Sequence, residues 1–362
     1  MQRLKYLDGI RGIMAIDVIL HHFVIVFCPV LYYVQYGGCW AKSPFAILNN
    51  GNIAVQFFFV LSGFLIVAGN INHEVNVRFI CRKMLERYFR LLPVIVAATI
   101  FSYTLMKMGF MFHLDLDGYV RQFEMVKQYN CFKPGIRDCL YNAFVKTFID
   151  SNDYVGPFWT IKWEMEGYLL LLVLSLLRKK KSIYYAINGV IFVLLYFKAQ
   201  NLMPFILGGG VAEMWIHGPD WMRHILMGTL KSFIGLAGLY FMTVPQEYAG
   251  IHDILNDIPG SANVWRAIGV SIVMGIILYS PLLQHFLENK FILFLGKISF
   301  ELYALHWPVI LSLGSFVYLR ELKKSGYTGA LCETLCVVLT SSVVCAFVLH
   351  QILKKLTGSE NL

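Results

Sequence analysis

The sequence contains little charge. Of its 362 residues only 15% are Asp, Glu, Lys or Arg, whereas 57% are apolar and 15% are aromatic. In a soluble domain roughly a quarter of the residues are charged. The shortage excludes a large soluble domain and predicts an integral membrane protein with several spans. The net charge of +9 does not indicate nucleic acid as a partner, because Lys and Arg cluster between apolar segments.

Three further features are missing. The eight cysteines form no CxxC motif and no His/Cys pairs at zinc spacing, so no metal site is indicated. The N-terminal segment lacks a small-residue cleavage site, so no cleavable signal peptide is expected. No internal repeat is visible, which disfavours transporters built from repeats.

The apolar residues fall into ten segments, each close to the ~20 residues that a helix needs to cross a bilayer. They cover residues 13–33, 53–70, 91–107, 158–177, 183–199, 202–216, 227–244, 265–283, 298–319 and 329–353. We therefore predict an all-α fold, a polytopic membrane helical bundle of about ten transmembrane helices in one domain over residues 1–362.

Lysine and arginine set the expected orientation. Basic residues precede span one and follow spans two, four, eight and ten, and all of these lie on one side if the N-terminus is cytoplasmic. Both termini are therefore predicted to be cytoplasmic. Arg320, Lys323 and Lys324 are exceptions that this count places outside. The longest extracytoplasmic loop is expected at about 108–157.

Three cysteines fall in the expected extracytoplasmic loops. Cys131 and Cys139 lie in the longest loop, and Cys39 lies in the loop before it. In an oxidising compartment two of the three can form a disulfide. Free thiols fit equally well, so no pairing is predicted.

The first span carries four ionisable groups, Arg11, Asp17, His21 and His22. Such groups are costly at membrane depth and are functional candidates by default. Arg11 and His22 fall within about 20° of one helix face and about 16 Å apart along its axis. This spacing suits a long anionic ligand that enters from the cytoplasmic side. The alternative is an interfacial arginine plus a histidine satisfied by a neighbouring helix. Asp17 and His21 share a face and can neutralise each other.

A second basic group precedes the third span. The predicted helix places Arg78, Arg82, Arg87 and Arg90 on the cytoplasmic surface. Arginine forks bind phosphate oxygens in bidentate fashion, so these residues can hold a polyphosphate such as that of coenzyme A. The alternative is an anchor for anionic lipids.

Other polar residues lie in or beside later spans. Ser62, followed by Gly63, serves either close helix packing or the cofactor site. Glu164 is expected to be buried, where a carboxylate can orient a histidine and stabilise its imidazolium form. Tyr303 and His306 should face the bundle interior, and His306 is a candidate second proton carrier.

These stretches together resemble the acyltransferase 3 family of integral membrane acyltransferases, over nearly the whole chain. The resemblance is carried by Arg11-Gly12-Ile13-Met14-Ala15 with His22 eleven residues after the arginine, Phe58-Phe59-Val60-Leu61-Ser62-Gly63-Phe64, Arg87-Tyr88-Phe89-Arg90-Leu91-Leu92-Pro93, Trp159-Thr160-Ile161 with Glu164 and Tyr168, and Gly296-Lys297-Ile298-Ser299-Phe300 with Leu302, Tyr303, Leu305, His306 and Pro308. Any one motif is weak, but five in order on a ten-span chain are specific.

The resemblance implies transfer of an acyl group, usually acetyl, from cytoplasmic acetyl-CoA or another acyl-CoA to a hydroxyl of a carbohydrate or lipid-linked glycan at the membrane. It implies His22 as general base, with Glu164 and Arg11 beside it in the catalytic group. Arg78, Arg82, Arg87, Arg90 and Ser62 are the expected donor-binding residues. Thr160, where serine is commoner, is a departure from the family pattern near Glu164.

The chain ends at Leu362 without the SGNH hydrolase-like domain that some relatives append. Acceptor transfer is therefore expected within the membrane domain or with a partner. The remaining alternatives are a transporter or flippase of acylated sugars, a sensor or scaffold, and an N-acyltransferase acting on an amino sugar. A bacterial inner membrane, contact with membrane lipids and a homodimer are further expectations, whereas the acceptor, the acyl chain and the choice between direct and ping-pong transfer are open.

Overall fold

The computed structural model describes residues 4–31, 44–120, 124–244, 255 and 262–357. The fold is 85% helix, and these ranges contain no strand, which confirms the all-α prediction. The longer helices are α1 (Lys5–Phe27), α2 (Gly51–Gly69), α3 (Val77–Lys107), α7 (Trp159–Ser175), α8 (Lys181–Lys198), α9 (Met203–His217), α11 (Leu230–Met242), α12 (Ala262–Tyr279), α15 (Ser299–Val309) and α16 (Ser315–Thr357).

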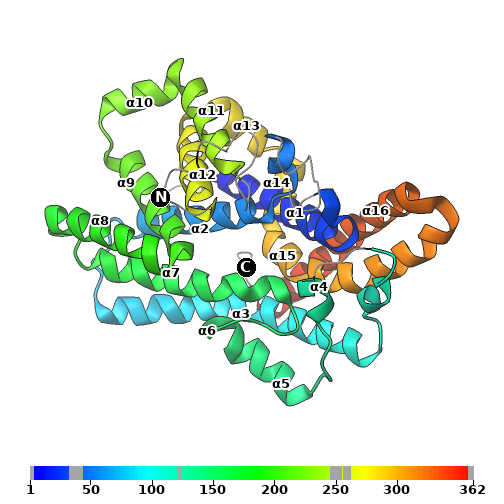
Figure 1. Ribbon diagram of the computed structural model, residues 1–362. Helices are drawn as coiled ribbons and strands as arrows, with labels where there is room; N and C mark the ends of the chain where they lie inside the picture. Colours follow the sequence, from blue (N-terminus) through cyan, green and yellow to red (C-terminus); the bar gives the residue numbers. More distant parts are fainter. Residues whose placement is uncertain (1–3, 32–43, 121–123, 245–254, 256–261, 358–362) are drawn as a thin grey trace.

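Short helical turns connect these elements. They are η1 (Pro29–Leu31), η3 (Pro44–Asn49), η4 (Phe112–Leu116), α4 (Glu124–Gln128), α5 (Ile136–Tyr141), η5 (Asn142–Lys146), α6 (Thr147–Ile149), η6 (Gly156–Phe158), η7 (Gln200–Leu202), α10 (Asp220–Met227), α13 (Pro281–Leu287), α14 (Lys290–Lys297) and η9 (Ile310–Gly314). The turns from η4 to η6 occupy the stretch for which a long loop was predicted. That stretch is therefore a folded cap, seen in the lower part of Figure 1 around the labels α4, α5 and α6.

Among the described residues, five helical runs are long and apolar enough to cross a bilayer. They are Lys5–Phe27, Gly51–Gly69, Val77–Lys107, Ala262–Tyr279 and Ser299–Leu356. The other predicted spans correspond to shorter helices, among them α7, α8, α9 and α11. An integral membrane protein is therefore supported, while ten spans and cytoplasmic termini stay predictions.

Two element boundaries differ from the sequence-based expectation. The basic stretch that was predicted as a surface helix is the beginning of α3, which continues through Pro93 without a break. The last two predicted spans are joined by helix, because α16 begins before Arg320 and runs to Gly326 before it turns back (Figure 1, right). Gly326 has φ 68°, a left-handed conformation that glycine adopts without steric cost.

The interior is built around α1 and α2. Helix α2 packs against α1 and α9, and α1 packs against α14 and α15. At the α2–α9 crossing a Cβ on Gly63 would overlap the backbone carbonyl of Phe205, and a Cβ on Gly208 would overlap that of Val60. Small residues let membrane helices approach closely. Gly63 therefore serves packing, one of the two roles predicted for the Ser62-Gly63 pair.

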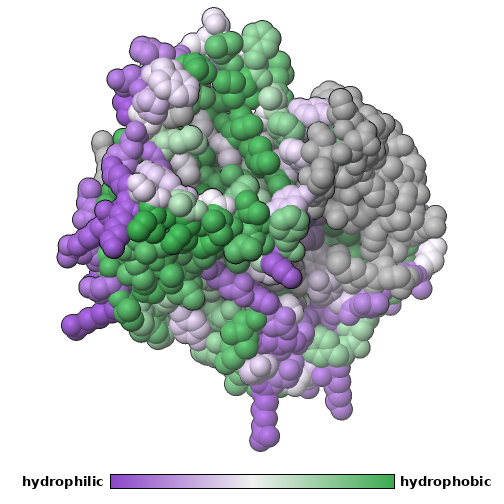
Figure 2. Space-filling model, turned by 60° about the vertical axis from the view of Figure 1, so that its left-hand side comes forward, coloured by the Kyte–Doolittle hydropathy of each residue, from purple (hydrophilic) through white to green (hydrophobic). Residues whose placement is uncertain are grey.

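The outer surface carries many large apolar side chains. On α8, for example, Val190 and Phe197 are exposed, as is Phe233 on α11. Figure 2 shows apolar residues over broad areas of one face, with hydrophilic residues along its left and lower margins. Exposed apolar areas of this kind mark membrane or protein contacts.

The cysteines of the cap are free thiols. Cys131 is exposed and Cys139 is buried. Cys39, the third cysteine considered for a disulfide, lies outside the described residues.

Candidate active site

Helix α1 presents the first part of the site. It is continuous from Lys5 to Phe27, so Arg11 and His22 share one face as expected, about 16 Å apart along the axis. Both side chains are half-buried. Asp17 is buried on the same helix but makes no hydrogen bond to His21, whose Nδ1 lies 3.1 Å from the carbonyl oxygen of Asn49. No hydrogen bond therefore joins Asp17 to His21, and their mutual neutralisation stays a prediction.

His22 is paired with a second histidine. Its Nδ1 lies 2.9 Å from the carbonyl oxygen of Val18 and 3.0 Å from Nε2 of His306, which is fully buried on α15. Nδ1 of His306 lies 3.2 Å from the carbonyl oxygen of Leu302. Each helix thus offers a backbone carbonyl to the Nδ1 of its own histidine.

These contacts assign the ring protons. A carbonyl oxygen only accepts, so Nδ1 of each ring carries the hydrogen, and Nε2 of His306 is free to accept from Nδ1–H of His22. Nε2 of His22 then carries a lone pair, and no described residue donates a hydrogen bond to it. A neutral imidazole with a free Nε2 can take a proton from a hydroxyl.

Aromatic side chains enclose the histidine pair. The Trp307 ring meets that of His22 edge-on at 5.0 Å between centroids, and the Tyr303 ring lies 6.0 Å from that of His306. The Tyr303 hydroxyl is 2.6 Å from the Thr160 hydroxyl and also donates to the carbonyl of Pro157. Thr160, the departure from the family pattern, thus joins the beginning of α7 to α15.

Glu164 lies in a separate polar group, one helical turn beyond Thr160. Its Oε1 accepts a hydrogen bond from Ser62 at 2.5 Å and forms an ion pair with Arg87. The Arg87 guanidinium also lies over the Tyr168 ring, 5.1 Å from its centroid. Helices α2, α3 and α7 each contribute to this group.

Among the described residues, no contact joins Glu164 to His22, contrary to expectation. Glu164 faces α2 and α3, whereas it is Thr160 that faces α15, so the carboxylate pairs with Arg87 instead. The partner of His22 is His306, which the sequence indicated as a second proton carrier but not as a direct neighbour of His22. The signal in the sequence for a role of His306 was its position inside an apolar helix.

The four arginines of α3 do not act alike. Arg87 is mostly buried and ion-paired, and it interacts electrostatically with both Arg90 and Arg11. Arg78 and Arg82 are exposed near the beginning of α3, and Arg82 pairs with Glu86. Arg87 is thus the arginine of α3 that contacts Glu164, and Arg90 and Arg11 lie within electrostatic range of it. We call Arg87, Arg90 and Arg11 the arginine group.

Residues from all five sequence motifs contribute to these two polar groups. Comparison with known families gives a match to the family model for an acyltransferase domain over residues 4–350, nearly the whole chain. The chain belongs to the acyltransferase 3 family. No curated protein matches it, and neither does any solved structure. Membership makes the chain a membrane acyltransferase, as the motifs indicated.

Within this acyltransferase the two polar groups are linked by α1 and α7. Arg11 lies at the arginine group and His22 at the histidine pair. Glu164 lies at the former, and Thr160 contacts Tyr303 beside the latter. A charged end and a neutral imidazole end thus lie along the same helices, an arrangement suited to a donor with a charged head and a reactive tail.

Proposed function

We propose that the chain transfers an acetyl group from cytoplasmic acetyl-CoA to a hydroxyl of a carbohydrate or lipid-linked glycan at a bacterial inner membrane. The observation that carries the proposal is the imidazole of His22, whose Nδ1 is held by Val18 and His306 so that Nε2 is left to accept a proton, on the same helix that carries Arg11. Family membership supplies the acyl-transfer class.

The donor phosphates would lie at the arginine group. Arg87 is already ion-paired with Glu164, so the exposed Arg90, on the same helix, is the cation that we expect to hold phosphate oxygens. Arg78 and Arg82 are exposed nearer the beginning of α3 and would add attraction at longer range. The pantetheine arm would then extend along α1 and bring the thioester to His22.

His22 would act as general base. The acceptor hydroxyl gives its proton to Nε2 while its oxygen forms a bond to the thioester carbonyl carbon. The C–S bond then breaks, and the CoA thiolate leaves with the proton from Nε2. Nε2 of His306 and the Val18 carbonyl accept from Nδ1–H and stabilise the transient imidazolium. We favour this direct transfer over an acetyl-histidine, whose formation would exchange labelled CoA into acetyl-CoA without any acceptor.

The test is transfer of labelled acetyl from acetyl-CoA by purified protein in lipid nanodiscs. His22→Ala should lower the rate by about 10²–10⁴-fold, the usual effect of losing a general base. His285→Ala, a change of an exposed histidine on α13, is the matched control and should leave the rate unchanged. Wild-type turnover by the His22 variant would refute the proposal. A wild-type protein that neither transfers nor hydrolyses the label would favour the transporter.

Glu164 would act by holding Arg87 and Ser62 in place. Removing one partner of a buried ion pair costs about 3–5 kcal/mol, because the other charge is left without compensation. Glu164→Gln should therefore lower the melting temperature in nanodiscs. It should also lower the affinity for acetyl-CoA, because Arg87 and Ser62 lose the carboxylate that positions them. The double variant Glu164→Gln/Arg87→Gln should regain stability, since no uncompensated charge remains, but should not regain donor affinity.

A further inference from the structure

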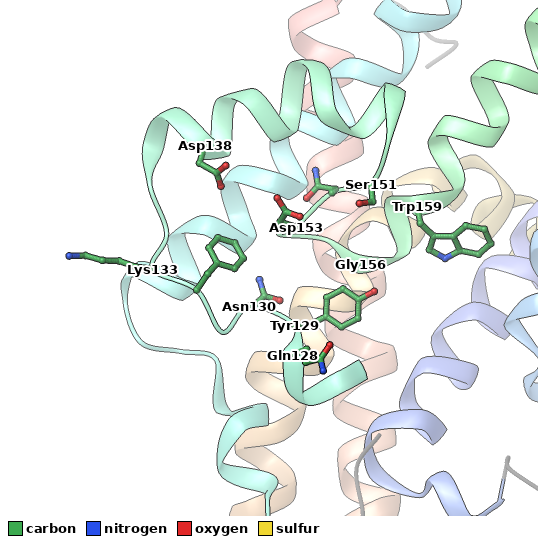
Figure 3. Close-up of a pocket in the computed structure, with 11 residues that line it drawn as sticks. Gln128, Tyr129, Asn130, Lys133, Asp138, Ser151, Asp153, Gly156 and Trp159 are labelled. Atoms are coloured by element: carbon green, nitrogen blue, oxygen red, sulfur yellow. The ribbon is translucent and has the colours of Figure 1, made fainter. Parts of the chain in front are cut away.

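A cavity of about 500 Å³ lies between the cap and the beginning of α7. It is lined by Gln128, Tyr129, Asn130, Phe132, Lys133, Asp138, Ser151, Asn152, Asp153, Gly156 and Trp159. Figure 3 shows side chains of the cap and of the segment before α7 arranged around it. None of these residues belongs to the arginine group or the histidine pair.

The cavity and the histidine pair share a wall, the short segment η6. On the cavity side the Tyr129 ring packs against Gly156 so closely that a Cβ there would come within 2.5 Å of it. On the other side the Pro157 carbonyl accepts from Tyr303, and the Phe158 ring lies 6.1 Å from that of Tyr303. Consecutive residues of η6 therefore contact both regions.

A line of rings also connects the two regions. The Tyr129 and Trp307 rings meet edge-on with centroids 5.1 Å apart, and the Trp307 and His22 rings are 5.0 Å apart. Tyr129 is fixed from behind, because His113 is buried and its Nε2 lies 2.9 Å from the Tyr129 carbonyl oxygen. The cavity is therefore separated from the proposed base by two aromatic side chains.

The lining has little net charge. Asp153 is neutralised by Lys146, whose Nζ is 2.7 Å from both carboxylate oxygens. Lys133 extends away from the other lining side chains in Figure 3. The remaining donors and acceptors are amides, a serine hydroxyl and the carboxylate of Asp138, with Tyr129 and the 38%-exposed Trp159 as aromatic surfaces. Polar groups of this kind among aromatic faces suit a neutral, hydroxylated ring and not a polyphosphate.

We propose that this cavity binds the acceptor, a neutral carbohydrate, and that Tyr129 and Trp307 form the partition through which its hydroxyl reaches His22. The inference rests on the proposed function, since it concerns the second substrate of the same reaction. It assigns the two substrates to opposite ends of the site, the anionic donor at the arginine group and the uncharged acceptor at the cap.

The test measures acceptor binding separately from transfer. Methyl glycosides of glucose, galactose and N-acetylglucosamine are the probes, and binding to the full chain in nanodiscs is detected by saturation-transfer NMR without any donor. Trp159→Ala should remove the signal, and Trp159→Phe should keep it. Trp221→Ala, a change of an exposed tryptophan on α10, is the matched control. In transfer assays Trp159→Ala should raise the glycoside KM about tenfold, the effect of losing about 1.4 kcal/mol of contact, with the acetyl-CoA KM unchanged.

The outcomes separate the two proposals. Transfer by the wild type with the same glycoside KM in Trp159→Ala would overturn the acceptor cavity and leave acyl transfer standing. Glycoside binding that requires Trp159, together with no transfer from acetyl-CoA, would support the cavity and overturn the proposed function. If no glycoside binds and none is acetylated by the wild type, both proposals fail.

Discussion

The contact between the two histidines gives the sharpest prediction. Replacing His306 with Leu removes the acceptor that lies 3.0 Å from Nδ1 of His22 and leaves the Val18 carbonyl at 2.9 Å as the remaining partner. His22 therefore keeps its tautomer but loses one of two hydrogen bonds to the imidazolium that forms during transfer. A hydrogen bond to a charged group contributes about 1.5–3 kcal/mol, which corresponds to a rate loss of about 10- to 150-fold.

The assay is the initial rate of acetyl transfer by His306→Leu in nanodiscs at saturating acetyl-CoA. His306→Gln is the informative companion, because its amide oxygen can accept from Nδ1–H and should restore part of the rate. The double variant His22→Ala/His306→Leu should be no slower than His22→Ala, since residues that act as a unit are not additive. A His306→Leu rate within about twofold of wild type, well below the expected loss, would refute the pairing as a catalytic feature.

Three other predictions concern packing, orientation and pH. Gly63→Ala should lower the free energy of unfolding by about 1–3 kcal/mol, and with it the melting temperature, because of overpacking at the α2–α9 crossing. Gly69→Ala is the control and should not lower the melting temperature, because nothing lies within 4 Å of a Cβ at that position. Equal melting temperatures for the two variants would contradict the close crossing. Cys131 and Cys81 are both exposed, and the cap that contains Cys131 is predicted to be extracytoplasmic. In single-cysteine variants a membrane-impermeant maleimide should therefore label Cys131 on intact cells and Cys81 only after permeabilisation. The reverse pattern would mean that the predicted orientation is inverted. Burial lowers the pKa of His113 in the cap, so on acidification the unfolded chain binds a proton at His113 before the folded chain does. The difference in free energy of unfolding between wild type and His113→Gln should therefore shrink as the pH falls below about 6.5. A difference that widens on acidification would contradict a neutral, buried His113.

The sequence predicted the helices better than their ends. Apolar length alone located α2 and α12 to within a few residues, because a bilayer requires about 20 apolar residues whatever the neighbours are. It did not predict that α3 starts at Val77 and continues past Pro93. Charged residues interrupt the apolar pattern, and a proline usually breaks a helix, yet the backbone is helical through both.

Pairing between helices was the least predictable part of the site. Helical periodicity correctly placed Arg11 and His22 on one face of α1, because that relation lies within a single helix. The partner of His22 comes from α15, far away in the sequence, and the spacing of residues carries no information about which carboxylate or imidazole faces it. A carboxylate can orient a histidine, which is why the sequence suggests Glu164 as the partner of His22. In the structure the Glu164 carboxylate pairs with Arg87 instead.

The distribution of charge explains why a histidine, and not a carboxylate, is the partner of His22. An ionised carboxylate in an apolar interior is costly unless a cation compensates it, and Glu164 has its compensating cation in Arg87. The His22–His306 pair is neutral at rest, so it can be buried beside Trp307 without any counterion. Charge then appears there only when His22 takes a proton. In the proposed reaction the arginines would retain the polyanionic head group of the donor, and an uncharged thioester and an uncharged hydroxyl would approach the imidazole.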